Sequence, residues 1–576
     1  MDLVFSETLL LSSAVFPLLL ALMLALRTLR AAAQILAPWA ALPALIATAF
    51  TPLPSGELHL PWLLLGSRFG LDATGGVFWT LAAVLWTVSG VYAKHYIKAQ
   101  QRSAFFLFFL LALAGNLLLI LARDIPGFYF GFTLMSLASY GLIVSNKSAP
   151  AFRAGRLYIL LVILGETALF SAMIMAVHLT GATTFEAVRT ALAKAENAEM
   201  ILWLLFIGFG IKAGVFGLHV WLPLAHPVAP APASAVLSGT MIKAGLLGWI
   251  RLFPVGTAAL PEWGSGLIVY GLFTAFYGAA VGMTQRDPKT LLAYSSISQM
   301  GIMTMIFGLG LSAPDAWPLM LSSIAFYALH HGLSKGALFL GSGLCGGERR
   351  ALRRWIWAGL WLPALAMAGA PWSSGMYAKL LAKSASAYAP EALAPLLPLL
   401  LSASTVATAL MMTRFLYLLR PASAAYGSPP MPGMLRPWAL LLIGIVLLPW
   451  LQGTATGPMT AQQFLQSFWP ILSAVAAAFV VLRTEVLHAI IPVPAGDLLL
   501  PMEYAARQLQ RTAGTVAARL SAWRKRASAR IRMARMRLVN TLISVHRQSE
   551  RRLTQWAVAV TLFLIILLAM IGSQSI

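Results

Sequence analysis

Charged side chains recur in the middle of long apolar stretches of this chain. Lys212 lies in the run Ile211–Gly214, Lys243 follows a second apolar run, and Glu166 is the lone acid between residues 157 and 175. An ionisable group at the centre of a bilayer costs about 2.5–3.5 kcal/mol on insertion scales, so such groups are rare and mark function. Several of them along one chain predict a proton or ion path through a membrane.

The composition agrees with a membrane protein. Of the 576 residues, 59% are hydrophobic and 10% are charged, whereas soluble proteins carry about 25% charged residues. The apolar runs are long and continuous, which predicts helices as the spanning elements. The net charge of +23 lies largely in loops and towards the C-terminus, so we expect anionic lipids as partners and no nucleic acid. The single cysteine, Cys345, excludes an intrachain disulfide, an iron–sulfur cluster and a cysteine zinc site.

Hydropathy predicts an all-α polytopic protein with about sixteen spans of roughly 20 residues. Two spans contain helix-breaking residues. Gly369-Ala370-Pro371 interrupts one, and several prolines from Pro223 onward follow the other. We expect N-terminal transmembrane helices at residues 1–100, a core at 101–420, additional transmembrane helices at 421–485, a basic amphipathic helix at 486–552 and a C-terminal transmembrane anchor at 553–576.

The basic segment near the C-terminus is unlike the rest of the chain. Arginine clusters alternate there with apolar residues at helical spacing, proline is absent after Pro501, and glycine is nearly absent after Gly514. This pattern favours a helix that lies along the membrane surface over a solvated charged linker.

Basic residues also predict the orientation of the chain. If the N-terminus is outside, the loops that fall inside hold most of the lysines and arginines, as the positive-inside rule requires. We therefore expect a multi-pass protein of a bacterial inner (cytoplasmic) membrane, with both termini on the periplasmic side and the lateral helix on the cytoplasmic side. The basic residues of these inside loops include Arg27, Lys94, Lys98, Lys147, Arg286, Lys289 and Arg414.

The ionisable residues in the predicted spans differ in how strongly they indicate proton transport. Lys212 and Lys243 lie too deep to reach the surface, and Lys379 follows the proline break, where unwound backbone lines cavities. A polar helix–helix contact is the alternative interpretation for the histidines. The candidates for proton translocation are Glu166, Lys212, Lys243, His331, Lys335 and Lys379, with His219, His226, His330 and Lys383 as secondary candidates.

No pattern of a catalytic or cofactor site is present. The sequence has no nucleotide-binding glycine loop and no cluster with metal-ligand spacing, and no Ser–His–Asp arrangement can be argued. We expect no catalytic residue, no cofactor and no metal in this chain, so any enzyme activity would belong to a larger complex.

Four stretches together resemble the antiporter-like proton-pumping subunits. That family comprises the large membrane subunits of respiratory complex I, the Mrp cation/proton antiporters and membrane-bound hydrogenases such as formate hydrogenlyase. The basic segment with its final span is similar to the lateral helix of the longest family member in complex I. The four stretches are Lys212–Pro223 with Ala225-His226-Pro227, Arg286–Ser298, His331–Leu340, and Gly369–Lys379.

The resemblance implies a fold of two inverted five-helix repeats, each with a broken helix. It implies that Lys212 and Lys379 are the lysines of the two broken helices and that Lys243 is the lysine of the central axis. It also implies that His331 and Lys335 are the histidine–lysine pair of the second repeat.

The chain departs from the family pattern at two positions. Thr133 stands where the family usually has a glutamate that partners the first lysine, and Gln299 replaces a common histidine. Glu166 matches an acid that some members have in the sixth span. It is the candidate substitute partner of Lys212, and we expect the two to interact; an altered first half is the alternative.

Three functions fit these observations. The first is a proton- or Na⁺-translocating subunit of a multisubunit complex of the NADH–quinone oxidoreductase or hydrogenase type, with other membrane subunits as partners. The second is a transporter that acts alone or in an Mrp-type antiporter, or that serves proton-driven inorganic-carbon uptake. The third is a scaffold subunit with impaired transport. The lysines that match the family favour the first function over the third, and the basic lateral segment favours it over a stand-alone transporter.

Overall fold

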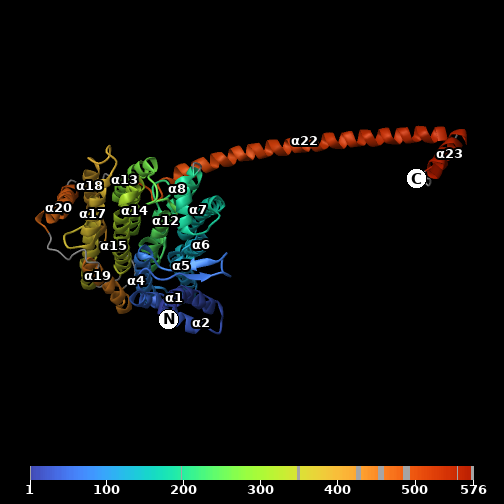
Figure 1. The fold of residues 1–576 in the computed structure, drawn as a ribbon. Coiled ribbons are helices and arrows are strands. Elements are labelled where there is room, and N and C mark those ends of the chain that lie inside the picture. The colour runs from blue at the N-terminus through green and yellow to red at the C-terminus, as the bar shows by residue number, and fades with distance from the viewer. Residues whose placement is uncertain are drawn as a thin grey trace. The chain divides into compact units, whose positions relative to one another are not determined.

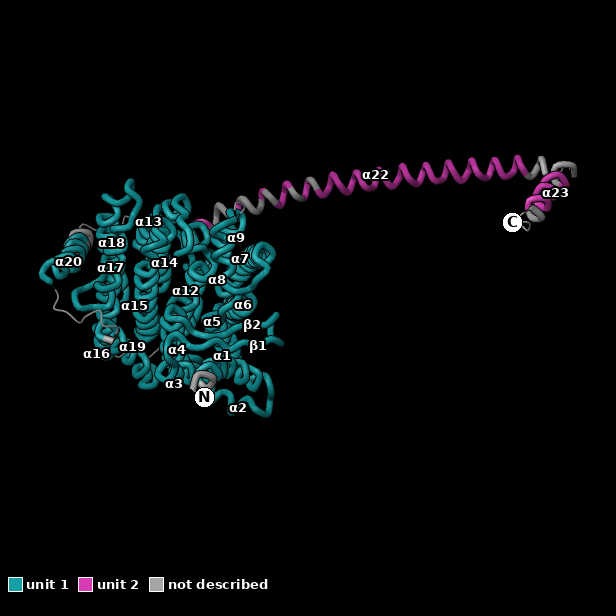
Figure 2. Tube along the Cα trace, in the orientation of Figure 1, with its two compact units in different colours: residues 1–497 teal, residues 498–576 magenta. Residues whose placement is uncertain are grey.

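The computed structural model describes residues 2–195, 198–346, 350–422, 430–451, 460–483, 493–553 and 556–572. The chain forms two compact units, residues 1–497 and residues 498–576 (Figure 2). The predicted domain boundary at residue 485 lies outside the described residues. Each unit is described by itself below.

Unit 1 is a bundle of helices with one short β-hairpin (Figure 1). The prediction of an all-α membrane protein is confirmed, with antiparallel β1 (Leu58–Leu60) and β2 (Ser67–Phe69) as the one described sheet. The helices are α1 (Asp2–Ala25), α2 (Arg30–Leu36), η1 (Ala37–Trp39), α3 (Leu42–Phe50), α4 (Ala73–Tyr96), α5 (Ala99–Leu121), α6 (Ile125–Ile143), α7 (Ala149–Thr180), α8 (Phe185–Lys194), α9 (Glu199–Ala213), α10 (Trp221–Val228), α11 (Ala231–Val236), η2 (Leu237–Met241), α12 (Lys243–Leu252), α13 (Pro261–Thr284), α14 (Pro288–Ser312), η3 (Pro314–Ala316), α15 (Trp317–Gly343), α16 (Arg350–Ala368), α17 (Ser374–Ala385), η4 (Ser386–Tyr388), α18 (Leu397–Leu418), α19 (Pro432–Leu451) and α20 (Ala461–Arg483).

Unit 2 consists of two helices, α22 (Leu499–Leu553) and α23 (Trp556–Gly572). The 55 residues of α22 form one continuous helix, which spans about 80 Å at 1.5 Å per residue. Nearly all of its described side chains are exposed. The predicted position of this helix on the cytoplasmic membrane surface stays a prediction.

Length and hydropathy identify nine helices among the described residues that can cross a membrane, or up to ten if the bent pair α2–α3 counts as one span. The broken spans fall below this test because their halves are short. For example, α9 has 15 residues and α17 has 12. The expected number of about sixteen spans and the inverted repeats therefore remain predictions.

The first break separates α9 from α10. Gly214 and Gly217 adopt φ values of 70° and 75°, a left-handed conformation that glycine takes without steric cost. The indole nitrogen of Trp221 donates to the carbonyl of Ile211 at 2.7 Å, so a carbonyl released by the break finds a partner inside the bundle.

The second break separates α16 from α17. Gly369 has a φ of 83°. Ser373 is the N-cap of α17, and its side chain accepts a hydrogen bond from the amide of Met376. A Cβ atom on Gly375 would lie 1.7 Å from the carbonyl oxygen of Ala366. The two half-helices thus approach each other too closely for any residue but glycine at this point.

An ion pair fixes α12 at the end away from Lys243. Arg251 donates to both carboxylate oxygens of Asp72, the N-cap of α4, and Arg123 pairs with the same carboxylate at 2.9 Å. Burial acts to raise the pKa of the Asp72 carboxyl, but the Arg251 guanidinium, the Gly75 amide and the Arg123 charge together outweigh burial and hold the pKa below its ordinary value. The helix that carries Lys243 is therefore anchored to α4.

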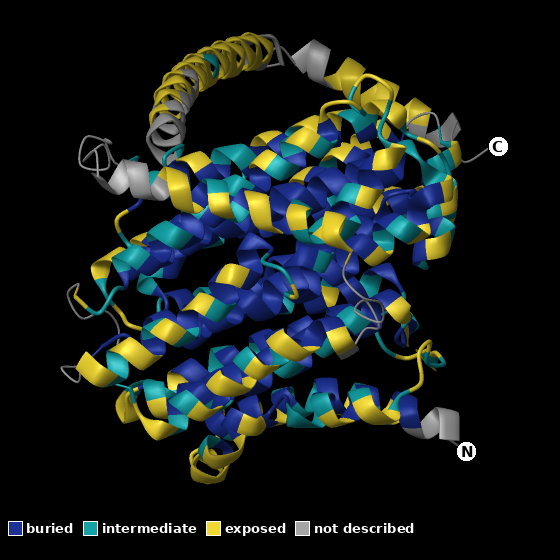
Figure 3. Cartoon of the chain, turned by 90° about the vertical axis from the view of Figure 1, so that its left-hand side faces the viewer, coloured by how far each residue is buried: buried dark blue, intermediate teal, exposed yellow. Residues whose placement is uncertain are grey.

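Close backbone contacts hold neighbouring helices of unit 1 together, and their shared faces are the buried ones in Figure 3. On α5, a Cβ atom at Gly115 would lie 2.4 Å from the amide nitrogen of Met135. On α6, a Cβ atom at Gly131 would lie 2.5 Å from the amide nitrogen of Leu119. These glycines let α5 and α6 pack at a distance that side chains would prevent.

The substitution Gly115→Ala tests this packing. The added methyl group must push α6 away, and overpacking of this kind costs about 1–3 kcal/mol. We expect a lower midpoint of thermal unfolding for the purified protein in detergent. Gly266→Ala in α13 is the matched control, because no atom lies within 4 Å of its Cβ position. Equal midpoints for the two variants would contradict the close contact.

Candidate functional site

Glu166 on α7 and Lys212 on α9 line the same small cavity in the first half of the bundle. Lys212 is buried, and its Nζ atom donates to the hydroxyl of Tyr158 at 3.1 Å. That hydroxyl donates in turn to the carbonyl of Ser136 at 2.8 Å. Glu166 and Lys212 lie close enough to act on each other electrostatically, so the geometry joins the expected acid and base.

Thr133 acts on Glu166 directly. Its hydroxyl on α6 donates to Glu166 Oε2 at 2.6 Å. The other carboxylate oxygen, Oε1, is buried without a hydrogen-bond partner among the described residues. A carboxylate from the adjacent helix thus lies beside position 133, and the threonine at that position helps to hold it.

Lys243 begins α12, directly after the π-helical turn η2. Its Nζ atom donates to the carbonyl of Ser238 in that turn at 2.6 Å, and the side chain is fully buried. The Ser238 hydroxyl lies 2.7 Å from the hydroxyl of Ser296 on α14. A π turn departs from regular helical hydrogen bonding and is frequent at functional sites. Here it provides an oxygen for a charged group in the core.

Lys335 on α15 is bound in a similar way. Its ammonium group donates to the carbonyl of Leu292 at 2.6 Å and to the hydroxyl of Ser295, both on α14. Ser295 and Ser296 also donate to the Leu292 carbonyl. One carbonyl oxygen therefore collects three side-chain donors at the contact between α14 and α15.

The two adjacent histidines of α15 differ in their surroundings. The Nδ1 atom of His330 lies 2.8 Å from the hydroxyl of Ser374, the first residue of α17. This contact fits the interpretation of His330 as a polar helix–helix link. His331 is fully buried, neither ring nitrogen has a partner among the described residues, and Lys243 and Lys335 lie within electrostatic range. These features favour His331 as the proton carrier of the two.

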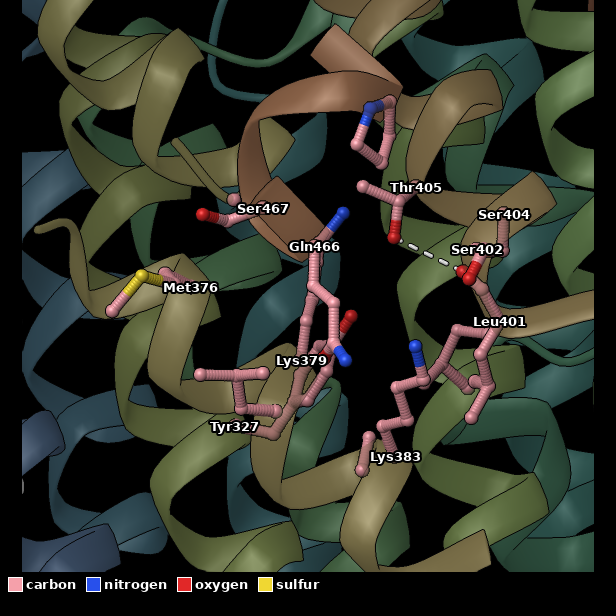
Figure 4. A pocket seen from close by; sticks show the side chains of 15 residues that line it. Tyr327, Met376, Lys379, Lys383, Leu401, Ser402, Ser404, Thr405, Gln466 and Ser467 are labelled. Carbon is pink, nitrogen blue, oxygen red and sulfur yellow. Dashed lines mark hydrogen bonds between the residues drawn. The ribbon is translucent and has the colours of Figure 1, made fainter. Parts of the chain in front are cut away.

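Lys379 lines a cavity of about 40 Å³ between α17, α18 and α20 (Figure 4). Such a volume exceeds the 10–15 Å³ that one water molecule requires. Lys383 lines the same cavity, together with Thr405 of α18 and Gln466 and Ser467 of α20. Sequence reasoning missed these three neutral polar residues, because they carry no charge that would distinguish them within an apolar helix.

Gln299 joins two hydroxyl groups close to this cavity. Tyr327 donates to its Oε1 atom at 2.7 Å, and its amide nitrogen donates to Thr408 at 3.1 Å. A neutral amide binds both groups but does not exchange protons near neutral pH. Gln299 thus forms a fixed polar link between the two hydroxyl groups.

The two remaining candidate histidines, His219 and His226, have different surroundings. His226 is buried and stacks on Phe339 with ring centroids 4.6 Å apart. His219, in the first break, contacts the carboxylate of Asp497 at 3.3 Å. Asp497 had no signal in the sequence as a site residue. Within the described ranges, no group of three or more His, Cys, Asp and Glu side chains is arranged to hold a metal ion.

Residues 122–359, which carry most of these groups, match the model of a family described as NADH:quinone oxidoreductase/Mrp antiporter, transmembrane. The match is confined to that segment of the chain. Hydrogenase-4 component B of Escherichia coli is 31% identical over 47% of this chain and 42% of its own length. A putative antiporter subunit mnhA2 of Staphylococcus haemolyticus is 30% identical over 56% of this chain and 44% of its own length.

The chain thus spans less than half the length of these curated relatives. The solved structure of the Mrp complex from Dietzia sp. DQ12-45-1b matches 89% of this chain and 60% of its own chain, with a TM-score of 0.72 and 22% identity. This likeness supports the fold of a multi-pass membrane subunit.

The contact between Thr133 and Glu166 can be tested with a hydrophobic carbodiimide, which reacts with carboxyl groups in apolar surroundings. We expect Thr133→Val to accelerate labelling of Glu166, because the hydroxyl no longer occupies Oε2. Thr167→Val is the matched control, since its hydroxyl donates to the Ile163 carbonyl instead. Mass spectrometry of the labelled peptide gives the rates, and the same rate in both variants would disprove the contact.

Proposed function

We propose that this chain is the proton-translocating membrane subunit of a complex I-like or hydrogenase-like multisubunit complex in a bacterial inner membrane. The observation that carries the proposal is the set of buried ionisable groups on α7, α9, α12 and α15, together with the half-buried Lys379 on α17. Lys212 and Lys379 adjoin the two helix breaks. Ionisable groups are retained in the core of a membrane bundle chiefly for transport or catalysis.

The first half supplies a switch between an acid and a base. Lys212 stays charged more readily when Glu166 is charged and near, and it releases its proton more readily when the two separate. The cavity between them and the break after Lys212 give the lysine room to move. A partner subunit that changes the distance between Glu166 and Lys212 would thereby make Lys212 take up or release a proton.

The second half supplies a relay. Lys243, His331 and Lys335 lie within electrostatic range of one another, and His330 lies within range of Lys379. Like charges in a low dielectric repel strongly, so a proton that arrives on one group favours release from the next. Lys379 and its cavity form the end of this relay.

The cavity chemistry favours protons over Na⁺ as the cargo of the second half. Na⁺ requires several oxygen ligands and benefits from carboxylates, as other hard cations do. The cavity offers two lysines and no carboxylate among its lining residues. Two ammonium groups repel a metal cation, whereas a lysine with a water molecule exchanges protons.

Partners are proposed from the relatives and from unit 2. The printed names of the relatives describe subunits or components, and the matched structure is that of a complex. The arginine-rich α22 offers a long basic surface for anionic lipids and for neighbouring membrane subunits.

The substitution Lys379→Ala tests the relay. We expect proton translocation to be abolished while the complex assembles in normal yield, because the side chain lies at a cavity and not in a helix contact. Lys98→Ala, at an exposed position before α5, serves as the control. The measurement is acidification of membrane vesicles with a pH-sensitive dye, and normal acidification by Lys379→Ala would refute the relay.

An exchange of residues tests the substitute acid. We expect Glu166→Thr to abolish proton translocation. We expect the double variant Thr133→Glu/Glu166→Thr to recover much of the translocation rate, because a carboxylate then stands at the adjacent position on α6. The same vesicle assay gives both rates. If Glu166→Thr pumps normally, Glu166 is not the partner of Lys212.

A further inference from the structure

A short segment before unit 2 is bound against the end of α13 and reaches the first helix break. Residues Val493–Asp497 form no helix and belong to unit 1. The amide of Val493 donates to the Thr284 hydroxyl at 3.2 Å, and the Gln285 side chain donates to the Val493 carbonyl at 2.9 Å. Both partners lie at the end of α13, next to the loop that carries basic Arg286. The segment is therefore anchored on this face of the bundle.

The segment carries one carboxylate, and that carboxylate points into the bundle. Asp497 Oδ1 lies 3.3 Å from His219 Nε2 and accepts a hydrogen bond from the Tyr294 hydroxyl at 3.2 Å. Gly496 makes this approach possible, because its φ of 72° and its contact with Leu224 would both be unfavourable for a larger residue.

His219 connects this carboxylate with the unwound part of the first break. The imidazole is fully buried, whereas the side chain of Asp497 keeps 8% of its surface exposed. The second ring nitrogen, Nδ1, is buried and has no hydrogen-bond partner among the described residues. His219 stands in the stretch between α9, which ends beside Lys212, and α10.

Aromatic residues border this pair. Phe216 stacks on the imidazole, and Tyr277 and Tyr294 lie against its edges. The carboxylate lies against the histidine, so the pair joins a side chain that keeps some contact with solvent and one that is fully buried.

We propose that Asp497 and His219 form the proton-exchange site of the first half, through which protons pass between water at this face and the break that follows Lys212. Asp497 exchanges a proton with water, and His219 takes it up at Nε2 and releases one from Nδ1 towards the break. No bond other than those to the transferred protons changes. This inference rests on the proposed function and adds a residue from outside the family segment to the proton path.

The variants Asp497→Asn and Asp497→Glu separate proton exchange from anchoring. Asparagine keeps an oxygen that accepts from Tyr294 and His219, but its amide does not take up and release a proton as a carboxylate does. We expect Asp497→Asn to slow proton translocation by about 100-fold, within the range for a lost proton-transfer group, and Asp497→Glu to restore much of the rate. Asp287→Asn is the control, because Asp287 caps α14 at the same face and asparagine caps equally well.

Chemical rescue gives a readout that a structural role would not change. Formate or azide at millimolar concentration should accelerate Asp497→Asn, because a small weak acid replaces the missing carrier at a partly exposed site. The assay uses the whole complex in vesicles, with wild type and Lys379→Ala as references. Rescue with unchanged assembly supports the proposal.

Three results would overturn the proposal in distinguishable ways. The first result is that the wild type translocates protons, Lys379→Ala does not, and Asp497→Asn translocates them at the wild-type rate. In that case the proposed exchange site is wrong and the proposed function stands. A slow Asp497→Asn variant that no weak acid accelerates also overturns it and assigns Asp497 an anchoring role. If wild type itself moves no protons, the proposed function and this inference fail together.

Discussion

Every buried ammonium group in this bundle needs an oxygen acceptor inside the protein, and this requirement shapes the fold around it. Lys243 binds the Ser238 carbonyl in a π turn, Lys335 binds the Leu292 carbonyl, and Lys212 binds the Tyr158 hydroxyl. An unpaired charge in the core costs several kcal/mol. The acceptor is a π turn for Lys243, a carbonyl within the regular helix α14 for Lys335 and a tyrosine hydroxyl for Lys212, so an internal oxygen beside each lysine is the condition under which its charge can stay in the bundle.

The same constraint applies to the acid in the first half of the bundle. Glu166 on α7 accepts a hydrogen bond from the Thr133 hydroxyl on α6, and it lines the cavity that Lys212 also lines. Gln299 instead meets Tyr327 and Thr408 through a neutral amide, which makes polar contacts but does not exchange protons near neutral pH. The first position thus holds an ionisable group, and the second holds a fixed polar link.

Local patterns in the sequence predicted the membrane fold, the two helix breaks and the buried lysines, because glycine, proline and charge in an apolar run each have one dominant physical meaning. Contacts between distant residues left no such signal. Asp497 meets His219 across 278 positions, and Gln466 and Ser467 reach the Lys379 cavity from α20 as ordinary neutral residues. The number of spans was equally hard to predict, since broken spans are too short to be recognised by length and hydropathy alone.

Lys243 offers the most direct test of proton movement along the buried lysines, because it begins α12 and belongs to the proposed relay. The measurement is proton flux by the purified complex in liposomes when Lys243 is replaced by methionine, which fills a similar volume without a charge. We expect the complex to assemble and the chemistry of its partner subunits to continue, whereas proton flux through this subunit is lost. Flux equal to that of the wild type would show that protons do not travel along the buried lysines.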